Sequence, residues 1–166
     1  MRAAVRLDSQ VSLRRFAPGD AAFVALLAEQ AFTEYSKNPA RYTQSVTERA
    51  DTRTWLAIEA GAPVGLVVLE PRGREAAVLV LAVTERQRGR GIGGLLMQAA
   101  ERDALAQGAK LLTLCTADAN LAALDLFLRR GFRIVRRRPG FYSRKQTGCE
   151  LEKQLAAGAG PRPDQS

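Results

Sequence analysis

The sequence predicts a single α/β domain around a mixed sheet, and three observations support that prediction. Apolar segments with the length and turn boundaries of strands alternate with segments of helical period. The chain has 166 residues, 46% of them hydrophobic, which suits one domain with a proper core. The elements follow the order strand, two helices, three strands, helix, strand, helix and two strands, or about seven strands and about four helices.

The N-terminal part predicts one strand and two helices. Residues 11–16 (VSLRRF) alternate like a strand, and the Pro-Gly-Asp turn at 18–20 opens a helix that should run to about Tyr35. Its buried side is expected to carry Phe23, Leu26, Leu27 and Ala31. Pro39 interrupts this pattern, and a short second helix is expected near 43–50.

Three apolar segments, 54–60, 64–70 and 76–83, are separated by short turn clusters and predict an antiparallel meander. Further along, residues 110–116 (KLLTLCT) predict a buried strand, and 120–130 predict a helix that ends at a glycine. The last two predicted strands are FRIVRRR and CELEKQL, at residues 132–138 and 149–155.

Between the meander and the next helix lies the loop ERQRGRGIGG, which combines glycines with arginines. Glycines allow positive φ angles and close approach of the backbone, and arginines make the approach electropositive. The loop leads into the N-terminus of a helix, where free N–H groups and the helix dipole favour an anion. The loop therefore predicts a phosphate-binding site.

Several functions could use such a loop. A P-loop is unsupported, because Gly94 is followed by Leu95 and Leu96 instead of Lys and Ser or Thr. The spacing Gly89-x-Gly91-x-x-Gly94, with Asp118 beyond it, satisfies the dinucleotide-binding pattern, but a meander of three strands precedes it. The net charge of +8 leaves a basic nucleic-acid- or ribosome-binding module as another alternative.

Composition excludes some chemistry and indicates a location. The chain has no histidine and two cysteines, so no zinc site or other metal site and no Ser-His or Cys-His nucleophile is expected. No segment approaches the length of a membrane helix, and MRAAVRLDSQ lacks the apolar core of a signal peptide, so we expect a cytoplasmic protein with no membrane partner. Residues 156–166 are expected to form a disordered tail after a domain over 1–155.

The loop and the helix that follows the fourth apolar strand resemble the GCN5-related N-acetyltransferases (GNAT family). The family's cofactor motif, Gln/Arg-x-x-Gly-x-Gly/Ala, stands here as residues 86–91 (RQRGRG). The family's asparagine at the start of the next helix is Asn120, and the Gly-Phe at its exit is Gly131-Phe132. The resemblance implies a mostly antiparallel sheet with a central V-shaped splay between Leu81–Thr84 and Leu111–Thr116.

The resemblance also implies acetyl-CoA as cosubstrate. Backbone amides of about 88–93 would bind its pyrophosphate, and its pantetheine arm would pair with the main chain of Leu81 and Val83. The expected cofactor-binding residues come from the last strand of the meander, the loop and the helix after the next strand: Leu81, Ala82, Val83, Arg86, Arg88, Gly89, Arg90, Gly91, Ile92, Gly93, Asn120 and Phe127.

The catalytic positions depart from the family. Many members have a tyrosine that protonates the thiolate, and this chain has Phe127 there; some have a glutamate base at a position that falls near Ala77. The candidates that remain are Glu75, two residues earlier, and Tyr142 in the PGFY segment. Glu34, near the end of the first helix, is a further carboxylate to consider.

The expected reaction is acetylation of a primary amine on a small molecule or on the N-terminus of a peptide or protein. The slot for it should lie near Tyr35, Tyr42, Arg41 and the turn before Tyr142. A basic rim of Arg136, Arg137 and Arg138 predicts an acidic acceptor, because like charges repel. Nucleic acid is not an expected partner of such an enzyme, and a homodimer is an open alternative to a monomer.

Overall fold

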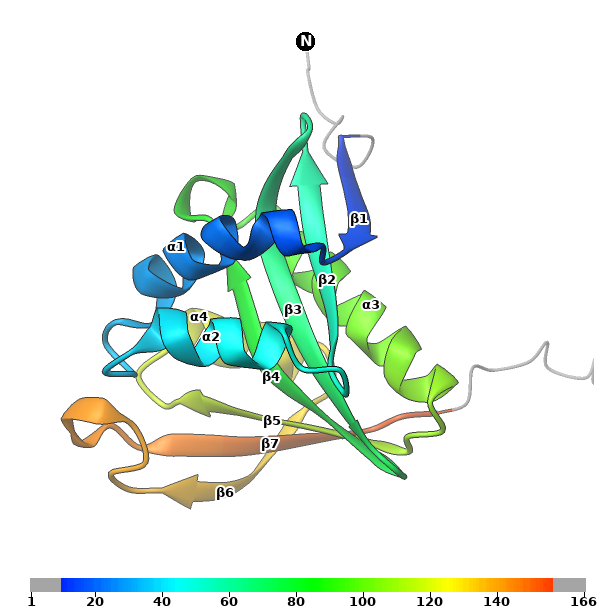
Figure 1. The fold of residues 1–166 in the computed structure, drawn as a ribbon. Coiled ribbons are helices and arrows are strands. Elements are labelled where there is room, and N and C mark those ends of the chain that lie inside the picture. The colour runs from blue at the N-terminus through cyan, green and yellow to red at the C-terminus, as the bar shows by residue number, and fades with distance from the viewer. Residues whose placement is uncertain (1–9, 157–166) are drawn as a thin grey trace, which may run out of the picture.

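A computed structural model describes residues 10–156, in which one seven-stranded sheet runs through the molecule (Figure 1). The order across the sheet is β1-β2-β3-β4-β5-β7-β6, and every neighbouring pair is antiparallel except β4 and β5. The strands are β1 Val11–Arg15, β2 Arg53–Glu59, β3 Ala62–Arg72, β4 Glu75–Val83, β5 Leu111–Ala117, β6 Arg133–Arg138 and β7 Gly148–Gln154. The predicted fold class and the predicted order of helices and strands along the chain are confirmed.

Two segments that carried predictions lie outside the described residues. They are the N-terminal residues 1–9, within the segment examined for a signal peptide, and residues 157–166 of the expected tail. Within 10–156, none of the helices combines the length and the apolar character that crossing a membrane requires.

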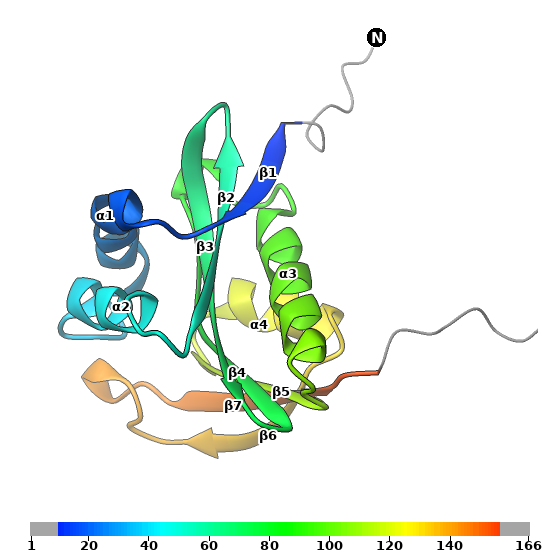
Figure 2. The same cartoon turned by 45° about the vertical axis from the view of Figure 1, so that its right-hand side comes forward.

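Four helices cover the two faces of the sheet. They are α1 Ala21–Phe32, α2 Pro39–Thr47, α3 Ile92–Ala106 and α4 Leu121–Arg129. Figure 2 shows α1 and α2 on one side of the sheet and α3 and α4 on the other. Each side buries its own apolar cluster, one around Leu27, Leu56 and Leu66 and the other around Leu96, Leu112 and Leu151.

The first two helices differ from the prediction in their bounds and in one face. Helix α1 ends at Phe32 instead of Tyr35, and α2 spans 39–47 instead of 43–50, because a proline at the first helical position starts a helix readily. The buried stripe of α1 is Val24, Leu27 and Ala28. The side chain of Leu26, which the sequence predicts on the buried side, is 59% exposed. The stripe still follows helical spacing, but it is rotated from the predicted one.

The sheet opens between β4 and β5. These strands pair only from Glu75–Val78 to Leu111–Leu114 and then separate. A β-bulge in β4 at Leu79, between the pairs Leu69↔Val78 and Val68↔Val80, coincides with the end of the pairing. The predicted V-shaped splay is thereby confirmed, although it begins two residues before Leu81. The opening exposes main chain and side chains in the middle of a sheet that would otherwise be continuous.

Candidate functional site

Three adjoining hollows pass through the opening in the sheet. We call them the loop groove, about 660 Å³ and lined by the glycine-rich loop and the start of α3; the central cavity, about 160 Å³; and the strand slot, about 700 Å³ and lined by β5 and β7. Leu81 and Asn120 line both the loop groove and the central cavity, and Cys115 and Tyr142 line both the central cavity and the strand slot. The three hollows therefore form one channel.

The loop groove ends at the N-terminus of α3. Gly89 and Gly91 have φ angles of +76° and +86°, which side chains other than glycine's rarely adopt, and Gly91 is the residue that begins the helix. No described side chain caps α3, so N–H groups of its first turn remain free. These free donors and the positive end of the helix dipole form the anion site that the loop sequence predicts.

The arginines of the loop lie in three different settings. Arg90 forms two hydrogen bonds to the carboxylate of Glu59, at 2.6 and 3.0 Å, and thereby ties the loop to the end of β2. Arg86 is exposed and does not line the groove, whereas Arg88 does. The prediction that all three side chains make the groove electropositive needs correction, because the charge of Arg90 is compensated and Arg86 lies elsewhere.

Main-chain groups of β4 face the opening. The N–H of Thr84 donates to the carbonyl of Val64 at 2.8 Å, so by strand alternation the main-chain groups of Leu81 and Val83 face away from β3. The Val83 carbonyl already accepts a hydrogen bond of 3.1 Å from Nε of Arg88. Leu81 therefore offers the main-chain groups that a bound chain could pair with most readily.

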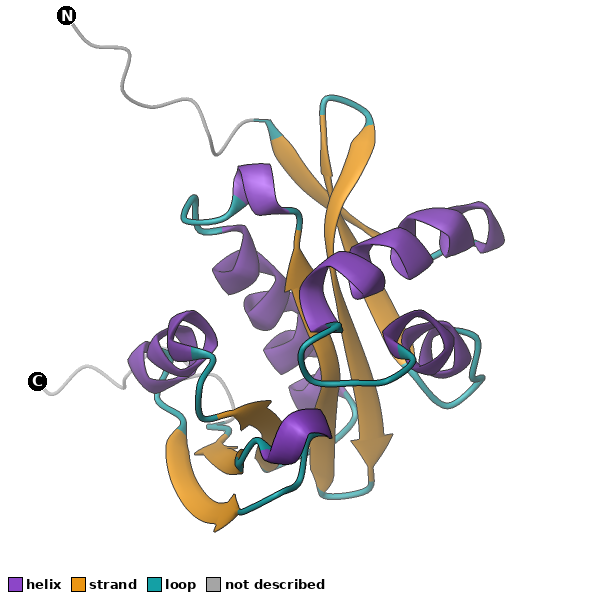
Figure 3. Cartoon of the chain, turned by 90° about the vertical axis from the view of Figure 1, so that its left-hand side faces the viewer, coloured by secondary structure: helices purple, strands orange, loops and turns teal. Residues whose placement is uncertain are grey.

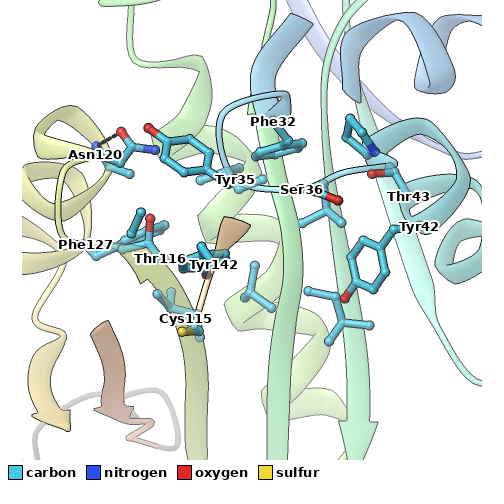
Figure 4. A pocket seen from close by; sticks show the side chains of 18 residues that line it. Phe32, Tyr35, Ser36, Tyr42, Thr43, Cys115, Thr116, Asn120, Phe127 and Tyr142 are labelled. Atoms are coloured by element: carbon cyan, nitrogen blue, oxygen red, sulfur yellow. Dashed lines mark hydrogen bonds between the residues drawn. The ribbon is translucent and has the colours of Figure 1, made fainter. Parts of the chain in front are cut away.

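The remaining residues expected at the cofactor also lie along the channel. Ala82, Ile92 and Gly93 line the loop groove. Asn120 caps α4 by accepting a hydrogen bond of 3.3 Å from the N–H of Ala123, and its side chain faces Tyr35 (Figure 4).

Phe127 lines the central cavity with only 4% of its surface exposed. Its ring packs edge-to-face on Phe132, with 5.8 Å between ring centres. Phe127 contributes packing and no proton donor to the cavity.

Tyr142 occupies the junction of the central cavity and the strand slot. Its ring packs edge-to-face on Tyr35, with 6.0 Å between ring centres, and it shares the wall of the central cavity with the Cys115 thiol. Burial raises the pKa of Tyr142 well above its usual value, and burial also raises the pKa of the Cys115 thiol. Both groups are therefore protonated at neutral pH.

The loop that carries Tyr142 is held against the connection between α1 and α2. The N–H of Ser143 donates to the carbonyl of Tyr35 at 3.2 Å, and Nε2 of Gln146 donates to the carbonyl of Glu34 at 3.3 Å. Figure 3 shows the short helical turn of this loop beside that connection, in front of the strands. These contacts fix the position of Tyr142 from outside its own loop.

Carboxylates are missing from the described lining of the central cavity. Glu75 is exposed at the first residue of β4 and lines none of the three hollows, because it lies at the paired end of the strand, away from the opening. Glu34 is exposed and lines the loop groove but neither of the other two hollows. The expectation of a base at Glu75 is therefore corrected.

The strand slot carries both signs of charge. Arg72, Arg138, Glu150 and Glu152 line it. Arg138 pairs with Glu150 at 2.9 Å, and Arg72 pairs with Glu70. The predicted basic rim holds for one of its three arginines, because Arg138 lines the slot and is paired with Glu150 there. Arg136 does not line the slot, and Arg137 donates to the sulfur of Cys149, which is buried in the core.

Glu150 and Glu152 are not predicted from the sequence as residues of the site. In CELEKQ the glutamates alternate with Cys149 and Leu151, which are fully buried. A period of two places the glutamates on the opposite face, so the signal was present, but nothing local in the sequence places that face against an opening.

The chain matches known proteins in sequence pattern and in fold. Residues 21–132 match the family model described as Acetyltransferase (GNAT) family. A comparison with curated proteins finds no match.

Solved structures of the same fold include three acetyltransferases. The ribosomal-protein-S18-alanine N-acetyltransferase of Escherichia coli has a TM-score of 0.78 and 16% identity, covering 92% of this chain and 98% of that one. Ard1 from Thermoplasma volcanium has a TM-score of 0.77 and 26% identity, covering 89% and 99%. A GNAT family acetyltransferase of Elizabethkingia anophelis, with acetyl-CoA bound, has a TM-score of 0.72 and 20% identity, covering 88% and 99%.

The match in sequence agrees with what the geometry of the channel provides, a free helix N-terminus and an opened sheet. It extends from the start of α1 through α4 to Phe132, which is most of the described chain. The chain belongs to the GNAT family of acetyltransferases, the enzymes that take acetyl-CoA as cosubstrate.

Proposed function

We propose that the enzyme acetylates a primary amine that enters the channel as the free base, and that the N-terminus of a peptide or protein is the acceptor that suits it best. Small-molecule amines of similarly low pKa meet the same requirement. The observation that carries this proposal is a continuous channel whose narrow centre has no carboxylate in its described lining.

The loop groove supports acetyl-CoA binding by its main chain. Free N–H groups at the start of α3 suit a pyrophosphate, and outward-facing main-chain groups of Leu81 suit an extended amide-containing arm. When bound, acetyl-CoA supplies an acetyl group activated as a thioester. The apolar central cavity, with Val78, Val80 and Phe127 in its wall, suits that uncharged end.

The acceptor must lose its proton before it can attack. An α-amino group has a pKa of about 7.7–8.0, whereas a lysine side chain has a pKa of about 10.4. At pH 7.5 roughly a third of α-amines are neutral, against roughly one lysine in a thousand. Since no carboxylate is among the described residues that line the cavity, the low-pKa amine has the advantage.

The Tyr142 hydroxyl is the proposed proton donor on the other side of the reaction. Burial raises its pKa and keeps it protonated over the range in which an α-amine is neutral, so it can donate a hydrogen bond to the thiolate as charge develops there, although the same rise in pKa makes complete proton transfer less favourable. It lies between the central cavity and the strand slot, where amine and thioester would meet. Holding the two reactants together there supplies much of the acceleration without a dedicated base.

Three of the arginines in the basic segment over 129–145 are paired with carboxylates, which weakens the alternative of a nucleic-acid-binding function. Arg129 pairs with Asp125 at 3.0 Å, Arg130 with Glu101 at 3.2 Å and Arg138 with Glu150 at 2.9 Å. Side chains held by carboxylates of the same chain are poorly placed to neutralise phosphates. The cytoplasmic location and a homodimer stay predictions.

The test compares α-amines with lysine amines at pH 7.5 by following thiol release from acetyl-CoA. The acceptors are Ala-Ala-Ala and a peptide that is blocked at its N-terminus and carries one lysine. We expect the α-amine peptide to be preferred by about 100-fold or more in kcat/KM, from the difference in free base. Preference for the lysine peptide, or retention on DNA without thermal stabilisation by acetyl-CoA, contradicts the proposal.

A further inference from the structure

We propose that the strand slot recognises a cationic side chain at the second or third residue of the peptide acceptor, with Glu152 as its partner. This inference rests on the proposed function and adds a substrate class to it. It replaces the preference for acidic acceptors that the three arginines of β6 predict.

The position of Glu152 follows from the register of β5 and β7. Glu150 lies opposite Cys115, and Glu152 lies opposite Thr113. Cys115 lines the central cavity, so Glu150 stands at the inner end of the strand slot and Glu152 one step farther out. Both carboxylates are on the face opposite to the buried Cys149 and Leu151.

The charges in the strand slot leave Glu152 as the available carboxylate. Glu150 is compensated by Arg138, and Arg72 is compensated by Glu70. Arg133 is opposite Glu152 in register, but it is exposed, does not line the slot and forms no ion pair with Glu152 within 4.0 Å in the described part of the chain. Glu152 is half-buried, so a cation beside it is less screened than on an open surface.

The distance along the slot fits a short stretch of peptide. Two residues along a strand span about 7 Å, which separates the Cys115 level from the Thr113 level. An extended acceptor with its amine at the Cys115 level advances about 3.3 Å per residue. Its second or third residue therefore arrives beside Glu152.

Net charge and local charge make opposite predictions for this acceptor. The whole chain carries +8, which favours an acidic partner at long range. At physiological salt the screening length is about 8 Å, so a bound residue responds chiefly to the groups that line the slot. The local carboxylate decides the preference once the peptide is in place.

The experiment measures kcat/KM for peptides Ala-Xaa-Xaa in which both Xaa are Lys, Gln or Glu. For the parent enzyme we expect Lys to exceed Gln, and Gln to exceed Glu, by about 3- to 10-fold at each step. Glu152→Gln should remove the advantage of Lys over Gln, and Glu152→Lys should make Glu the best of the three. Glu48→Gln, the same change of charge at an exposed residue outside the channel, should leave the order unchanged.

An unchanged order of the three peptides in Glu152→Gln, or an advantage of the Glu peptide in the parent enzyme, overturns the inference. The uncharged Gln peptide distinguishes a failure of the role of Glu152 from a failure of the proposed function. If it is acetylated well and charge makes no difference, only the role of Glu152 is lost. If none of the three peptides is acetylated although acetyl-CoA binds, the proposed function itself is contradicted.

Discussion

The loop groove and the strand slot are two ends of one channel, but they are built from different parts of the chain. Residues 81–94 form one wall of the loop groove, and residues 30–35 and 120–129 form the others, but its distinctive groups are main-chain N–H and C=O groups and glycines of positive φ from the first of these segments. The strand slot takes its side chains from the α1–α2 connection, α2, strands β3, β4, β5, β6 and β7, and the β6–β7 loop. The phosphate-binding part of the loop groove is a local motif, whereas the charged and aromatic side chains of the strand slot come together only in the tertiary structure.

This difference separates cosubstrate binding from acceptor choice. A site made of main-chain groups depends on backbone conformation and tolerates many side chains around it. A slot made of side chains from distant segments can change its charge by single substitutions that leave the loop unaltered. Mutations at the two ends should therefore move different kinetic constants, and the predictions below test that separation.

The largest effect is expected in the glycine loop. Gly91→Glu or Gly89→Glu should weaken acetyl-CoA binding on the order of 100-fold, because each forces a side chain into a positive φ and adds negative charge at the phosphate site. Calorimetry measures the affinity. Gly73→Glu is the matched control, with a φ of +68° and the same added charge in the turn between β3 and β4. An equal loss of acetyl-CoA affinity in all three variants would show that backbone strain, and not a lost phosphate site, causes the effect.

A smaller effect is expected at the junction of the central cavity and the strand slot. Tyr142→Phe keeps the ring that packs on Tyr35 but removes the hydroxyl, so kcat for a neutral peptide should fall about 10- to 100-fold. Acetyl-CoA affinity should stay within about twofold, because the phosphate site is untouched. A kcat within twofold of the parent would assign the proton transfer to water.

The smallest effect is expected at the anchor of the loop. Hydrogen bonds from Arg90 hold the pKa of Glu59 below its usual value, so the pair is intact at neutral pH and is lost only as pH falls through that lowered pKa. The ratio of the acetyl-CoA affinities of the parent and of Glu59→Gln should therefore be flat from about pH 6 to pH 9. Glu59→Gln should weaken binding about 2- to 5-fold across this range, as calorimetry can measure. A ratio that changes with pH in that range contradicts this role.

The fold and the loop groove could be predicted from the sequence because their signals are local. The three strands of the meander follow from apolar segments and turns, and the phosphate site follows from glycines before a helix. Even so, the arginines of the loop did not all serve the groove. Arg90 meets Glu59, which is 31 residues away, and no local pattern indicates that pairing.

The strand slot could not be predicted in the same way. The position of Tyr142 depends on hydrogen bonds to the carbonyls of Glu34 and Tyr35, more than 100 residues earlier. The net charge indicated basic residues near the acceptor, but the charge of a slot is set by which side chains pair within it. Glu150 and Glu152 lie on a strand whose outer face looks like ordinary solvated surface in the sequence.

The central claim is that the amine enters as the free base, and the pH profile of kcat/KM tests it most directly. Three peptides would be measured from pH 6 to pH 10. They differ only in their first residue, Ser, Ala or β-alanine, and therefore in the pKa of the N-terminal amine. The ascending limb should shift with the pKa of the amine, unit for unit, because Tyr142 stays protonated and no described carboxylate lines the cavity. One common pKa for all three peptides would reveal a base on the enzyme and contradict the account.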